Sequence, residues 1–143
     1  LRVIETLSEA GVPTGAMVAP VIPFVNDEEI EAIDAACAQA GERKAAYNLL
    51  RLPREEGPLI QEWQDEHYPL KASRVESAVR EMRGGKLYRS GWGQRMRGTG
   101  PIAELISSRF AKALAANDLI GDDRMGALKT DLFQPPGYQE SLF

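Results

Sequence analysis

Cysteine and histidine are almost missing from this sequence of 143 residues, which contains one of each, Cys37 and His67. A single cysteine cannot form a disulfide within the chain, which is typical of proteins from a reducing compartment. One cysteine and one histidine also cannot assemble a zinc or iron–sulfur site from this chain alone. We therefore expect no metal ligands here, a packing role for Cys37 and a solvated His67 near a helix end.

Long apolar segments are missing too. No apolar run approaches the roughly 20 residues that span a bilayer. Residues 1–11 lack the basic segment followed by an apolar segment that marks a secretory signal. A content of 43% hydrophobic and 27% charged residues is ordinary for a soluble, folded protein. We therefore predict a cytoplasmic protein with no membrane partner.

The common nucleotide-binding and catalytic motifs do not occur. The run GGKL at 84–87 is not a phosphate-binding loop, because Arg80 stands where the first glycine belongs and Leu87 replaces the serine or threonine. The run GWG at 91–93 lacks the third glycine of a dinucleotide fingerprint and follows a predicted helix rather than a strand. The sequence also contains no GxSxG and no HExxH. We predict no catalytic residue in this chain.

The first half of the chain alternates between strand and helix patterns. Residues 12–21 and 45–50 are apolar at successive positions, as expected of strands that are buried on both faces of a parallel sheet. Residues 28–40 between them have helical spacing, with Asn26 or Asp27 as the predicted N-cap. Alternating strands and helices indicate an α/β fold with a parallel sheet. Further helices are predicted over 58–68, 71–82 and 101–117.

Two βα units are too few for a complete parallel fold, since a full (β/α) barrel needs about 250 residues. The chain also starts inside a helical pattern without an initiator methionine. We expect this chain to be the C-terminal portion of a larger protein. Its sheet should then have an open, apolar face or edge, available to the missing N-terminal barrel half or to a second copy of the chain.

Positive charge is concentrated in residues 80–100, which contain six Lys/Arg and one acidic residue, whereas residues 1–79 contain seven and fourteen. Five glycines from Gly84 to Gly98 and two aromatic residues, Tyr88 and Trp92, accompany the cations, so the stretch interrupts all periodicity. Three interpretations remain open: a site for a small anion, a nucleic-acid contact, or pairing with acidic residues at 55–66. The predicted substrate- or anion-binding residues are Arg83, Lys86, Tyr88, Arg89, Trp92, Arg95 and Arg97.

The carboxyl ends of the two predicted strands are the other candidate site, because ligands of parallel α/β folds bind just beyond these ends. They read APVIP at 19–23 and LRLP at 50–53. The two prolines of the first segment would leave backbone carbonyls exposed and hold an apolar surface that suits a flat ring such as adenine. Alternatively, these prolines only terminate the strand.

Four segments, MVAPVIPFVNDEEI, AAYNLLRLP, REMRGGKLYRSGWGQRMRG and TDLFQPP, resemble the C-terminal half of radical S-adenosylmethionine (SAM) proteins. The branch in question is spore photoproduct lyase-like, or DNA repair photolyase-like, and the segment at 80–98 is the most specific. The resemblance implies that residues 1–68 form the last two βα units of a partial (β/α)6 TIM-like barrel. Residues 69–143 would be a helical extension with an Arg/Gly-rich loop at 83–100.

The resemblance also implies a chemistry. The whole enzyme would cleave SAM at a [4Fe–4S] cluster to generate a 5′-deoxyadenosyl radical that attacks a substrate, which the resemblance does not identify. The three cluster cysteines, spaced CxxxCxxC, would precede this chain, so the chain alone would not be catalytically competent. The rival hypothesis is a non-enzymatic nucleic-acid-binding module using the basic loop 80–97, which the acidic remainder of the surface disfavours. The residues implied in the SAM site are Ala19, Pro20, Ile22, Leu50 and Arg51.

Overall fold

The computed structural model describes residues 1–88, 90 and 94–121. Most predicted helices and strands are present with their ends shifted by a few residues, whereas α5 interrupts a stretch that the sequence predicts to be irregular. Within this part of the chain, no helix combines the length and the apolar character needed to cross a membrane. The elements are α1 (Arg2–Glu9), β1 (Ala16–Val21), the 3-10 turn η1 (Asp27–Glu29), α2 (Ile30–Gln39), β2 (Ala45–Leu49), α3 (Glu56–His67), α4 (Ala72–Met82), α5 (Gln94–Arg97) and α6 (Pro101–Ala116).

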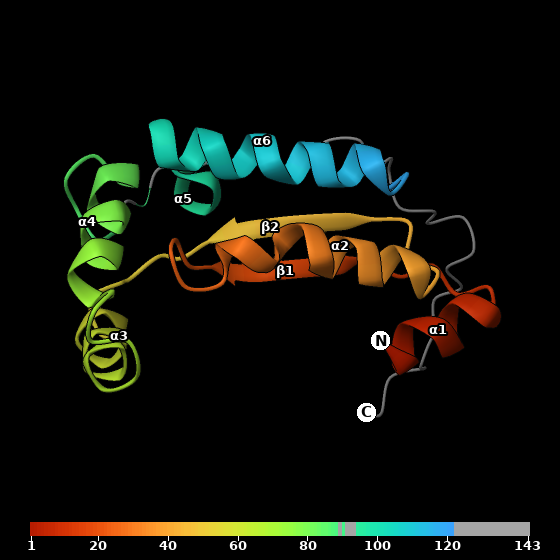
Figure 1. Cartoon of the computed structure of the whole chain (residues 1–143), viewed down its shortest axis with the longest axis horizontal. Coiled ribbons are helices and arrows are strands. Elements are labelled where there is room, and N and C mark those ends of the chain that lie inside the picture. Colours follow the sequence, from red (N-terminus) through yellow and green to blue (C-terminus); the bar gives the residue numbers. More distant parts are fainter. Residues whose placement is uncertain (89, 91–93, 122–143) are drawn as a thin grey trace, which may run out of the picture.

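The two strands lie side by side and run parallel, which confirms the predicted pairing. Met17 is in register with Ala46, and Val18 is in register with Tyr47. The strands are connected by α2, which packs along them. Helix α6 contacts α2 and runs in nearly the same direction as α2 and the strands (Figure 1). In the described part of the chain the fold is therefore mixed α/β with a two-stranded parallel sheet.

One face of β1 is open, which corrects the prediction that this strand is buried on both faces. Val18 and Val21 are buried, but Met17 is 57% exposed, and Ala19 and Pro20 are exposed as well. The physical reason is that no described helix covers these three positions of β1. By contrast, β2 is buried at every position except Asn48, which is partly buried. An apolar, open sheet face is what the sequence predicts for an incomplete set of βα units.

The C-terminal helix α6 belongs to the same core as the strands. The rings of Tyr47 on β2 and Phe110 on α6 lie 4.7 Å apart between centroids. The guanidinium of Arg109 donates to both carboxylate oxygens of Glu31, at 2.8 and 2.6 Å, and to Asp27 at 3.3 Å. This bidentate pair lowers the pKa of Glu31. The two parts predicted as residues 1–68 and 69–143 therefore share one hydrophobic core.

The start of α2 differs from the prediction that Asn26 or Asp27 caps the helix. Neither side chain makes a capping hydrogen bond to the helix. Their oxygens instead accept from the preceding loop: Asn26 Oδ1 from the backbone N–H of Ile22 at 2.7 Å, and Asp27 Oδ1 from that of Phe24 at 2.6 Å. The two residues fix the loop after β1 rather than the helix start.

Asp34 on α2 is fully buried, and neither of its carboxylate oxygens has a hydrogen-bond partner among the described residues. Burial, followed by repulsion from Glu31, raises the pKa of Asp34 to about 6. Because the folded-state pKa lies above the unfolded one, the folded state takes up this proton more readily. Ionised Asp34 therefore destabilises the fold above this pKa, and the penalty disappears as the pH falls toward the unfolded value.

The substitution Asp34→Asn should raise the free energy of unfolding by about 2 kcal/mol at about pH 7.5, because it removes the cost of a buried charge. The gain should fall to about half of that near pH 5, because the cost disappears only as the pH approaches the unfolded pKa. Urea denaturation at both pH values measures this difference. Asp65→Asn makes the same chemical change at an exposed position of α3 and serves as the control. Equal effects of Asp34→Asn at both pH values would contradict the statement that ionised Asp34 destabilises the folded state.

Candidate functional site

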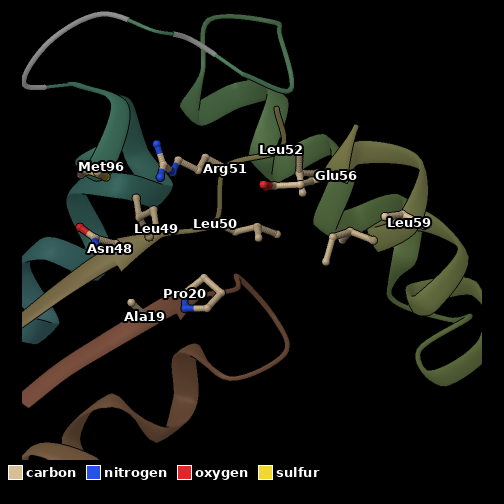
Figure 2. A pocket seen from close by; sticks show the side chains of 11 residues that line it. Ala19, Pro20, Asn48, Leu49, Leu50, Arg51, Leu52, Glu56, Leu59 and Met96 are labelled. Atoms are coloured by element: carbon tan, nitrogen blue, oxygen red, sulfur yellow. The ribbon is translucent and has the colours of Figure 1, made fainter. Parts of the chain in front are cut away.

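A hollow of about 430 Å³ lies at the edge of the sheet where both parallel strands end. Its volume falls in the range of roughly 300–1,000 Å³ that is usual for small-molecule sites. The residues around it come from β1, β2 and the segment after β2, α3 and α5 (Figure 2). The lining residues are Ala19, Pro20, Asn48, Leu49, Leu50, Arg51, Leu52, Glu56, Leu59, Ile60 and Met96.

The end of β1 forms one wall of the hollow through a local irregularity. The strand register shifts between Val18 and Val21, so Ala19 and Pro20 bulge out of the regular ladder. Pro20 has no N–H to donate, and its carbonyl oxygen accepts a hydrogen bond from Asn26 Nδ2 at 3.1 Å. The Asn26 side chain thereby gives the Pro20 carbonyl a hydrogen-bond partner and fixes the loop. The exposure of carbonyls at the two prolines stays a prediction.

The end of β2 forms the floor, and Arg83 holds it from behind. The backbone N–H of Leu50 donates to Val21 O at 2.9 Å, which joins the two strand ends. Arg83, at the C-terminal end of α4 and only 2% exposed, donates from Nη2 to the carbonyl oxygens of Leu49 and Leu50 at 3.3 and 3.1 Å. Burial, followed by repulsion from Arg51, lowers the pKa of Arg83.

The hollow combines apolar surfaces with three polar side chains. Pro20, Leu50 and Leu59 supply apolar contact area, and Asn48, Arg51 and Glu56 supply an amide, a guanidinium and a carboxylate (Figure 2). Arg51 extends toward Met96 on α5, whereas Glu56 points in from α3. This arrangement can hold a small organic molecule against the apolar side chains and orient it through its polar groups.

Four of the five residues predicted for the cofactor site line this hollow: Ala19, Pro20, Leu50 and Arg51. The fifth, Ile22, lies in the hydrophobic core instead, because the chain turns inward after the bulge. Sequence analysis missed Asn48, Glu56, Leu59 and Met96. A polar residue inside an apolar strand pattern was a usable signal for Asn48, whereas the other three reach the hollow only through helix packing.

The residues predicted to bind an anion are distributed over different environments. Arg83 holds backbone carbonyls, and Arg97 lies 4.4 Å above the Tyr47 ring, beside a second hollow of about 580 Å³ against α6. Lys86 is exposed, whereas Tyr88 and Arg95 are partly buried. The predictions for Arg89 and Trp92 fall outside the described residues. The described geometry thus gives Arg83 a structural role, and anion binding by the set stays a prediction.

Another interpretation of the basic stretch was that its cations pair with acidic residues at 55–66. Arg80, the first cation of the stretch, pairs with a residue of its own helix instead. Its Nη2 lies 2.7 Å from Glu76 Oε1, one turn earlier on the same helix. Both side chains are well exposed, so the pair contributes little to stability.

Cys37 lies buried on α2 rather than at the hollow. Burial, followed by the charge of Asp34, raises the pKa of its thiol, which is the opposite of an activated thiolate. Within the described ranges, no group of three or more His, Cys, Asp or Glu side chains has a metal-binding arrangement. The donor set of this chain, with its single thiol, does not fit an iron–sulfur cluster.

The substitution Arg83→Met should lower the free energy of unfolding by about 3 kcal/mol, because it leaves two buried carbonyl groups without their donor. It should also accelerate amide hydrogen exchange at Leu50 more than at core positions of α6, because the strand end loosens locally. Urea denaturation and exchange measured by NMR test both effects. Arg80→Met, at an exposed position one turn earlier, is the control. Unchanged exchange at Leu50 would contradict the structural role of Arg83.

No protein-family model, curated protein or solved structure matches this chain.

Proposed function

We propose that this chain is the C-terminal part of a radical SAM enzyme, and that the hollow at the strand ends contributes to the binding of S-adenosylmethionine. The observation that carries the proposal is the position of the hollow, which lies at the carboxyl edge of parallel strands, where α/β folds bind ligands. The sequence resemblance supports it, because four of the five residues that the resemblance implies line this hollow.

The residues around the hollow fit the adenosyl part of SAM. Pro20, Leu50 and Leu59 offer apolar surface to a flat base, and the volume of about 430 Å³ accommodates a nucleoside. The Asn48 amide and the Glu56 carboxylate can exchange hydrogen bonds with amino and ring nitrogens. The role of these residues is to bind and orient the cofactor and to keep water from one side of it.

The radical chemistry belongs to the cofactor. When bound with its iron–sulfur cluster, SAM supplies a carbon radical that removes a hydrogen atom from a substrate. The single cysteine of this chain does not fit the cluster, so the proposal requires three cysteines from another part of the enzyme. The remaining strands of the barrel would pair along the edge of β1 that β2 does not occupy, and the open face of β1 would point into the barrel. A reducing, cytoplasmic setting suits such a cluster.

Titration of the isotopically labelled chain with SAM, followed by backbone NMR, tests the proposal. The amides of Ala19, Asn48 and Leu50 should shift and saturate with a Kd of about 1 mM, because this chain supplies only part of the proposed SAM site. Leu59→Glu should weaken binding at least about tenfold, because it places a carboxylate on the apolar wall. Leu59 is 65% exposed, so this variant should fold normally.

Leu105→Glu is the matched control, since Leu105 is a 60% exposed leucine on α6 that does not line the hollow. Equal affinity of both variants for SAM would place the binding elsewhere and contradict the proposal. A single-stranded oligonucleotide that binds through residues 80–97, with an affinity that falls steeply with salt, would support the nucleic-acid-binding alternative instead.

A further inference from the structure

Arg51 stands out among the residues of the hollow because its charge is not compensated. It follows β2, is partly buried and lines the hollow. Within the described part of the chain, its guanidinium has no hydrogen bond or ion pair. The acidic residue of the lining, Glu56, extends from α3, whereas Arg51 extends to the α5 side (Figure 2).

A second guanidinium increases the positive potential at this end of the hollow. Arg83 is buried behind the floor and is fixed on the carbonyl oxygens of Leu49 and Leu50. Arg51 is close enough to repel it, since its charge contributes to lowering the pKa of Arg83. Two like charges in a partly desolvated region repel each other at a cost in free energy. An anion bound in the hollow beside Arg51 would offset that cost.

The other polar groups of the hollow divide it into two ends. Asn48 lies on the Arg51 side and can donate through its amide, whose nitrogen otherwise contacts Met17 Sδ at 3.8 Å. Glu56 lies on the α3 side, where a carboxylate repels anions and accepts hydrogen bonds from donors. The apolar side chains of Pro20 and Leu50 lie between these groups, and Leu59 lies beyond Glu56 on α3 (Figure 2).

We propose that the Arg51 end of the hollow binds a carboxylate or phosphate of the ligand, with the Glu56 end taking a hydrogen-bond donor or a cationic nitrogen. A planar guanidinium favours this chemistry, because it binds carboxylate and phosphate oxygens in pairs. This inference rests on the proposed function, because both concern ligand binding in the same hollow. The anion can come from SAM, which carries a carboxylate, or from an anionic substrate bound beside it.

Three probes test the inference by NMR titration of the full chain: adenosine, adenosine 5′-monophosphate and phenyl phosphate. The monophosphate should bind about tenfold more tightly than adenosine at low salt, and Arg51→Gln should abolish this difference. Arg54→Gln is the control, because it removes the same charge at an exposed position three residues further that does not line the hollow. Phenyl phosphate should bind in the same Arg51-dependent way.

The outcomes separate the inference from the proposed function. Adenosine binding without any gain from phosphate, or an equal gain in Arg51→Gln, would overturn the inference and leave the proposed function standing. Arg51-dependent binding of phenyl phosphate without binding of any adenosyl compound would support the inference and overturn the proposed function. No binding of any probe up to about 10 mM would overturn both.

The source of the anion follows from a competition between phenyl phosphate and SAM. Displacement of phenyl phosphate by SAM supports the inference and assigns the Arg51 end to the carboxylate of the cofactor. Simultaneous binding of both also supports it and assigns this end to an anionic substrate.

Discussion

The buried guanidinium of Arg83 is the contact on which the geometry of the strand ends depends. It donates to the carbonyl oxygens of Leu49 and Leu50, at the point where β2 ends and the chain turns away from the sheet. Leu49 and Leu50 are buried, so without Arg83 these carbonyls would lose the donor that the described structure gives them. The helix that carries Arg83 thereby fixes the floor of the hollow, and the adjacent Leu50 N–H joins this floor to β1 through Val21.

Side chains from outside the sheet fix the carboxyl end of each of the two strands. Asn26 holds the bulge of β1 through its bonds to Pro20 and Ile22, and Arg83 holds the end of β2. The strand ends are consequently shaped by residues that do not face the hollow themselves. Two charged side chains among the described residues differ in what their charge does. Asp34 destabilises the core when ionised, whereas Arg51 is partly exposed at the hollow, where a ligand can compensate its charge.

Local patterns predicted most of the elements and the parallel pairing, because buried strands and amphipathic helices leave apolar periodicities in the sequence. They also predicted four residues of the hollow, because ligands bind at strand ends in this class of fold. The role of Asn26 was mistaken for helix capping, because the same residue type also fixes loops, here through contacts to Pro20 and Ile22. The role of Arg83 could not be predicted, since it depends on a contact with a distant segment of the chain. The same holds for the burial of Ile22, the exposure of Met17 and the short helix α5, which packs against β2.

We propose that an adenosyl group lies on the apolar floor of the hollow. Intermolecular NOEs between the adenine protons of SAM and methyl-labelled leucines of the chain would report this contact. We expect NOEs to the methyl groups of Leu50 and Leu59, which line the hollow, and none to those of Leu105 or Leu70. NOEs confined to leucines outside the hollow, such as Leu105 on α6, would contradict it.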